Sequence, residues 1–186
     1  MSTTDELSKA YSGLLGEQVQ VKKGRKGKNV VIMAKSRVKR ELTEKQIEAR
    51  QQLSLAAEYA RTALQDPALN EMYQKRAQNG VSVFRTAAND FLQRPFIRDV
   101  DASEYHGNPG DVIRVSAGDK IGLTEVRAKL LAPDGTLVES GPCVRALPTA
   151  GYLYTAMVQV SDISGMTVTV TVRDTPGNIV NKLLTL

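Results

Sequence analysis

Apolar residues recur every three to four positions in the middle of the chain, which predicts a block of three helices over residues 43–94. Thr43 and Gln46 fit a capping box that starts the first helix. The apolar residues of this helix share one face and predict its core: Ala49, Leu53, Ala56, Tyr59, Ala60, Ala63 and Leu64. Asp66-Pro67 predicts the start of the second helix, and Ser82 predicts the cap of the third, which ends before Pro95.

From Pro95 onward apolar residues recur at every second position, and alternation of this kind is typical of strands. Asp134-Gly135 is a strong signal for a hairpin turn between two of them. Seven short strands in the remainder of the chain predict an antiparallel sandwich. These strands are expected near 95–101, 111–117, 123–132, 136–141, 152–160, 166–173 and 178–186.

Before the helices, residues 17–34 alternate in the manner of two short strands around a glycine-containing turn at 24–27. The complete pattern predicts an α+β protein in three parts. Residues 1–42 form a basic β-hairpin arm and linker, residues 43–94 a helical block, and residues 95–186 an immunoglobulin-like antiparallel β-sandwich.

The third part resembles bacterial immunoglobulin-like or fibronectin-III-like domains. The segment Asp174-Thr175-Pro176-Gly177-Asn178 is similar to the Asp-x-x-Gly-Asn turn that often leads into the last strand of such modules. The chain lacks the paired cysteines and core Trp of antibody domains, so the resemblance implies only the sandwich class. It implies a spacer or adhesive module of the kind found on cell surfaces and phage virions, which is seldom catalytic. The first half has a basic hairpin followed by the helix start Leu42-Thr43-Glu44-Lys45-Gln46, and in this it resembles small uncharacterised bacterial proteins, which implies no function.

Charge is distributed unevenly along the chain of 186 residues. The net charge is +5, yet residues outside 18–40 carry a net charge of −4. The basic stretch contains no acid, and we predict that its nine basic residues bind a partner or nucleic acid phosphates. They are Lys22, Lys23, Arg25, Lys26, Lys28, Lys35, Arg37, Lys39 and Arg40. No aromatic residue interleaves them for stacking on bases, so base-specific recognition is not expected.

Candidate catalytic residues are few. His106 and Cys143 are the only residues of their types, and nothing in the spacing brings them together as a nucleophile and its base. The glycines at 24–27 lack the P-loop spacing. Asp99, Asp101 and Glu104 are oxygen ligands of the kind that Ca²⁺ prefers, but no EF-hand pattern is present. We therefore predict no catalytic site, no metal, no cofactor and no small-molecule substrate.

These observations predict a non-enzymatic structural or assembly protein. Its basic arm and helices would dock on a larger complex, for example a phage or virion-like particle, and it would present the immunoglobulin-like domain. The alternative is an accessory protein that binds nucleic acid without sequence specificity through the basic hairpin. A protein assembly or homo-oligomer is the expected partner. No secretion signal is evident near the start of the sequence, so synthesis in the cytoplasm without export and no membrane association are expected.

Overall fold

The computed structural model describes residues 14–15, 19–23, 29–33, 41–78, 80–147 and 151–186. The chain divides into two compact units, residues 1–44 and 45–186. In the first unit, β1 (Leu14–Leu15), β2 (Val19–Lys23) and β3 (Asn29–Met33) form an antiparallel sheet in that order. The side chains of all nine basic residues between positions 18 and 40 lie outside the described part of the chain.

Three helices follow at the predicted positions. They are α2 (Glu44–Ala63), α3 (Pro67–Arg76) and α4 (Val83–Leu92). The Asp66 carboxylate accepts hydrogen bonds from the backbone N–H groups of Ala68 and Leu69, and the Ser82 hydroxyl accepts one from Arg85. The predicted caps of α3 and α4 are therefore confirmed, and each satisfies backbone donors that a helix start leaves without partners.

The helices pack through small residues around a buried tyrosine. Tyr73 of α3, Ala87 of α4 and Ala60 of α2 are completely buried. Ile121, from the loop between two strands of the following sheets, belongs to the same core. The loop therefore joins the helical block to the β-sheets by apolar contact.

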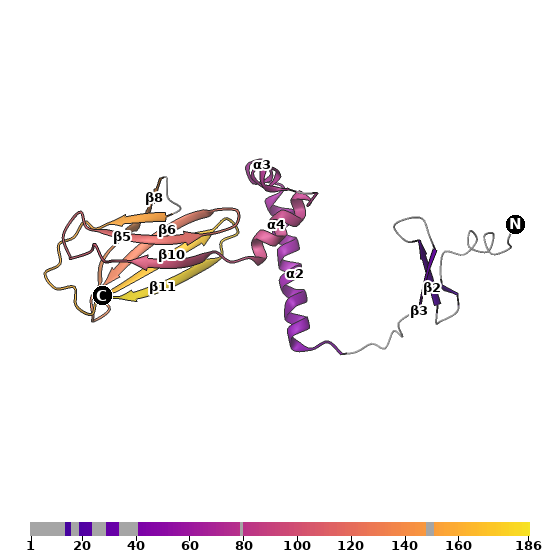
Figure 1. Ribbon diagram of the computed structural model, residues 1–186, viewed down its shortest axis with the longest axis horizontal. Helices are drawn as coiled ribbons and strands as arrows, with labels where there is room; N and C mark the ends of the chain where they lie inside the picture. Colours follow the sequence, from indigo (N-terminus) through magenta and orange to yellow (C-terminus); the bar gives the residue numbers. More distant parts are fainter. Residues whose placement is uncertain (1–13, 16–18, 24–28, 34–40, 79, 148–150) are drawn as a thin grey trace. The chain divides into compact units, whose positions relative to one another are not determined.

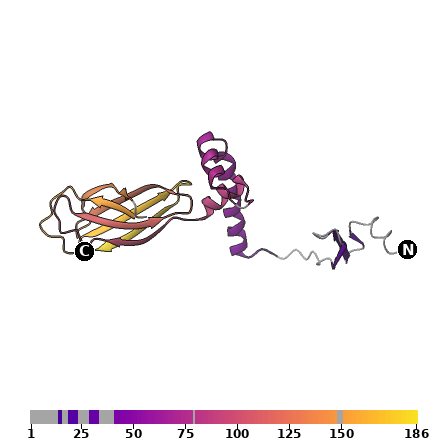
Figure 2. The ribbon, with the colours of Figure 1, turned by 45° about the horizontal axis from the view of Figure 1, so that its top comes forward.

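The rest of the chain forms two antiparallel sheets of four strands each, one in the order β11-β10-β6-β7 and the other in the order β4-β5-β9-β8 (Figures 1 and 2). Alternate residues of both sheets fill one core, with Ile113 from β5 and Leu130 from β6 completely buried. The strands are β4 (Phe96–Asp101), β5 (Val112–Gly118), β6 (Leu123–Leu131), β7 (Leu137–Pro142), β8 (Val144–Ala146), β9 (Gly151–Thr155), β10 (Thr167–Asp174) and β11 (Ile179–Thr185).

The helices and antiparallel sheets confirm the α+β class, and two details of the strand prediction are wrong. The strand expected over 152–160 ends at Thr155, because the backbone leaves the β5–β9 ladder shortly afterwards. The Ala156 N–H still donates to the Asp111 carbonyl in the register of that ladder, but the Met157 N–H donates to the Glu139 carboxylate instead. The short edge strand β8 was not predicted. Among the described helices, none has both the length and the apolar character needed to cross a bilayer.

Candidate docking surface

Among the described residues of the helical block, α3 and α4 pack beside only the C-terminal half of α2. Residues 45–55 are exposed throughout, whereas Ala56, Ala60 and Ala63 are buried. The cause is length. α2 has 20 residues, while α3 and α4 have 10 each, so at about 1.5 Å per residue they cover only about half of α2. Figures 1 and 2 show both short helices beside the C-terminal half of α2.

The apolar face of α2 continues across this boundary with alternating three- and four-residue steps, the spacing of a coiled-coil seam. We call this face the α2 seam, and its residues are Gln46, Ala49, Leu53, Ala56, Ala60 and Ala63. Leu53 is 59% exposed. The sequence predicted that all apolar residues on this face are buried in the core. That prediction is right for the C-terminal half of α2 and wrong for Ala49 and Leu53.

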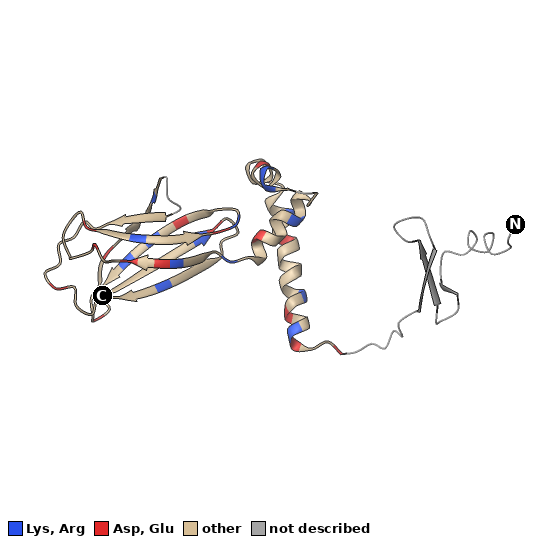
Figure 3. Ribbon diagram, in the orientation of Figure 1, with Lys and Arg blue, Asp and Glu red and all other residues tan. Residues whose placement is uncertain are grey.

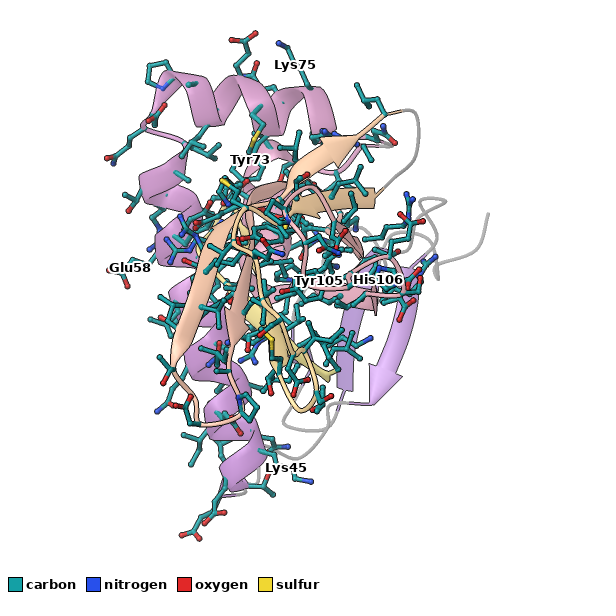
Figure 4. The ribbon with its side chains drawn as sticks, turned by 90° about the vertical axis from the view of Figure 1, so that its left-hand side faces the viewer. Lys45, Glu58, Tyr73, Lys75, Tyr105 and His106 are labelled. Atoms are coloured by element: carbon teal, nitrogen blue, oxygen red, sulfur yellow. The ribbon has the colours of Figure 1, made fainter. Side chains whose placement is uncertain are left out.

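Basic and acidic side chains of α2 lie on different faces of the helix. Lys45 and Arg50 lie beside the seam, at the positions that flank a coiled-coil interface. Glu48 and Glu58 lie on the face turned away from it. Lysine and arginine are blue and acids red in Figure 3, and Figure 4 shows Lys45 near the free end of α2, far from Tyr73. The seam is thus apolar in its centre and basic at its edges.

A chain of buried hydroxyl groups holds the C-terminal half of α2 in place. The Tyr59 and Tyr73 hydroxyl oxygens are 2.8 Å apart, and the Tyr73 hydroxyl donates to Asp90 Oδ2 at 2.7 Å. Tyr59 also packs on Phe91, with ring centroids 5.3 Å apart. All three helices are therefore joined by one polar network and one aromatic contact.

Asp90 is the least ordinary member of this network because it is only 2% exposed and its Oδ1 atom has no hydrogen-bond partner among the described residues. Burial raises the pKa of Asp90 to about 6, while the hydrogen bond from Tyr73 opposes the shift. The carboxylates of Asp119 and Asp174 raise it further, and the Lys120 ammonium lowers it. The pKa of Tyr73 is also raised, chiefly by burial.

A second carboxylate, Asp174, connects the helices to the sheets. It is 1% exposed and accepts two hydrogen bonds from Asn178, from the backbone N–H at 2.7 Å and from Nδ2 at 2.8 Å. The same Nδ2 group donates to the carbonyls of Phe91 and Gln93 at the end of α4, each at 3.2 Å. Gly177 supplies the positive φ of +94° that this turn requires. The Asp174–Asn178 turn therefore fixes the helical block.

The two residues examined as a nucleophilic pair have ordinary surroundings. Burial raises the pKa of the Cys143 thiol to about 12, so the thiol stays protonated at neutral pH. His106 is exposed in the loop between β4 and β5, and its backbone N–H donates to Asp111. Protonation and burial of Cys143 disfavour attack on a substrate.

The acids considered for Ca²⁺ make other contacts. Asp101 accepts a hydrogen bond from the Ser103 N–H, and both Glu104 oxygens accept from Arg114 at 2.8 Å. Across the described ranges, no group of three or more His, Cys, Asp or Glu side chains is arranged to hold a metal ion.

Comparisons with known proteins leave the family open. No protein-family model, no curated protein and no solved structure matches the chain. The candidate site therefore depends on its geometry alone. The features that sequence reasoning missed are the buried Asp90 and the exposed half of the α2 seam.

Proposed function

We propose that the protein is a non-enzymatic structural or assembly protein that docks on a larger complex, such as a virion-like particle, through its basic arm and its helices. In this proposal the two-sheet part of the chain is an immunoglobulin-like domain, presented by the complex. The carrying observation is that the α2 seam extends beyond the residues that α3 and α4 cover, which leaves Leu53 59% exposed. An apolar helix face that continues beyond its partners offers the spaced anchors that helix-to-helix docking uses.

The chemistry of α2 indicates what kind of partner fits the seam. Lys45 and Arg50 flank it, and the basic stretch ends at Arg40, shortly before α2 begins. An amphipathic helix of another protein, with acidic residues beside its own apolar seam, would match both features. A second copy of this chain matches less well. In a parallel pair Lys45 would face Arg50 of the other helix, and like charges oppose pairing.

The exposed seam is short, so its own affinity is modest. From Gln46 to Leu53 it spans about two helical turns, or about 10 Å. The basic arm directly precedes it in sequence and would act as a second contact on the same partner, which raises the effective affinity without new contacts in the helix. Both segments are therefore needed for stable docking in this proposal.

Leu53→Lys is expected to reduce the size of the complex in which the protein sediments in extracts of its source cells. The wild-type chain is expected to sediment in a complex far larger than its own 20.3 kDa. Leu53→Lys places a charge in the seam and should lower the bound fraction about ten-fold, and deletion of residues 18–40 should do the same. Leu55→Lys is the matched control, because Leu55 is 48% exposed on another face of α2.

Nucleic acid binding is the competing outcome of the same experiment. If the large complex disappears after nuclease treatment, and purified protein binds DNA with an affinity that falls steeply between 50 and 300 mM salt, the basic arm acts on phosphates. In that case Leu53→Lys has no effect, and the docking proposal is wrong. It is also wrong if Leu53→Lys and Leu55→Lys behave alike.

A further inference from the structure

Three cationic side chains from three separate elements line one groove beside the helical block. Arg76 comes from the last turn of α3, Lys120 from the loop between β5 and β6, and Arg145 from β8. The groove has a volume of about 290 Å³, and Tyr152 of β9 adds an aromatic side chain to its wall. Because these residues are distant in sequence, only the fold brings them together.

The charges of this groove are largely uncompensated. Within the described ranges, the four ion pairs join Lys75 to Glu71, Arg114 to Glu104, Arg127 to Glu125 and Lys182 to Asp99. None of them uses Arg76, Lys120 or Arg145.

Asp119 is the carboxylate that lines the groove, and its Oδ2 atom accepts hydrogen bonds from the Ile121 and Gly122 N–H groups at 2.8 and 3.0 Å. Lys120 also interacts electrostatically with the buried Asp90, so part of its charge is offset. Among the described lining residues three cations, Arg76, Lys120 and Arg145, stand against one carboxylate, that of Asp119, so the lining is positive.

The groove is built on fixed backbone. On one side of Lys120, the Asp119 carboxylate fixes the turn by accepting a hydrogen bond from the Ile121 N–H. On the other side, Ile121 is 8% exposed and packs in the core of the helical block. Arg145 stands opposite Tyr152 in the antiparallel pair of β8 and β9. A site whose backbone is already ordered loses less entropy when a ligand binds.

We infer that this groove binds a small molecule that carries two or more adjacent anionic groups, of which a diphosphate is the simplest. Two guanidinium groups can each form paired hydrogen bonds with phosphate oxygens, and the Lys120 ammonium adds a third positive charge to the groove. A volume of about 290 Å³ holds a diphosphate with room for a further group beside Tyr152. The inference is independent of the docking role proposed for α2.

Isothermal titration of the full chain with pyrophosphate, and with inorganic phosphate for comparison, tests this site. Pyrophosphate is expected to bind about ten-fold more tightly than phosphate, because it can contact more than one cation at once. The double variant Lys120→Gln/Arg145→Gln should lose at least about ten-fold in pyrophosphate affinity. Addition of a polycarboxylate such as citrate distinguishes phosphate chemistry from a general response to negative charge, and weaker binding of citrate is expected.

The control removes two positive charges elsewhere on the same fold. Lys129→Gln/Arg127→Gln changes exposed residues of β6 and leaves the groove and the basic arm intact. This variant should bind pyrophosphate as the wild type does. Equal losses in both double variants would assign the binding to net charge, and no binding at millimolar pyrophosphate would show that the groove is not a polyanion site; either result overturns the inference.

Discussion

Asn178→Ala is expected to loosen the helical block and to lower the free energy of unfolding by about 2–4 kcal/mol. The change removes the Nδ2 group that donates to Asp174 and to the carbonyls of Phe91 and Gln93. The Asp174 Oδ2 atom loses this donor while its residue stays 1% exposed, and a buried charge without its partner is costly. Urea denaturation gives the free energy, and hydrogen exchange of the α4 amides locates the loosening.

The matched control for this variant is Asn181→Ala in β11, the strand that follows the Asp174–Asn178 turn. Asn181 accepts a hydrogen bond from the Thr171 hydroxyl at 2.7 Å on an exposed face, so its removal should cost less than about 0.5 kcal/mol. Faster exchange in α4 for Asn178→Ala alone is the expected pattern. If both variants lose the same stability, the Asp174–Asn178 turn does not fix the helices.

Asp90 is expected to make the protein less stable as the pH rises from 4 to 7. Its folded-state pKa is raised from 3.8 to about 6, so between these values the unfolded chain loses the proton and the folded chain keeps it. The folded state therefore has its full advantage below pH 4 and loses it as the pH passes through 6. This pKa difference between the unfolded and folded chain corresponds to about 3 kcal/mol in the free energy of unfolding. Most of this pH-dependent change should be absent in Asp90→Asn.

Urea denaturation at a series of pH values measures this effect, with Asp99→Asn as the control. The Asp99 side chain is 69% exposed and lies 3.8 Å from Lys182, so its curve should run parallel to that of the wild type. Tyr73→Phe adds a second check. It removes the hydroxyl that donates to Asp90 Oδ2 and lowers the pKa of Asp90. Without it the pKa of Asp90 should rise further, and the loss of stability should occur at a higher pH. Parallel curves for wild type and Asp90→Asn would contradict the assignment.

Local signals predicted the elements well. Asp66-Pro67 and Ser82 determine where α3 and α4 begin, since each supplies a cap within its own turn. Period-two alternation located the strands from Phe96 onward, except for β8. Val144–Ala146 is too short to show a period. The end of β9 was not predictable either, because the Met157 and Val158 N–H groups donate to Glu139, which is distant in sequence.

Burial was harder to predict because it depends on contacts between distant segments. Aspartate usually lies on the protein surface, but Asp90 lies three positions after the buried Ala87, on the inner face of α4. The exposure of Leu53 had a signal in the sequence: the predicted first helix was about twice as long as either of the others, so two short helices could not cover it. The roles of the nine basic residues stay predictions, since those side chains lie outside the described residues.

Photo-crosslinking from position 53 in the source cells would reveal whether the α2 seam binds another protein. Two variants, one with benzoylphenylalanine at position 53 and one with it at position 55, sample the seam and a different exposed face of α2. We expect a crosslink from position 53 to a helical segment of another protein with acidic residues beside its apolar face, and much less from position 55. Equal yields from both positions, or crosslinks from position 53 to nucleic acid, would contradict it.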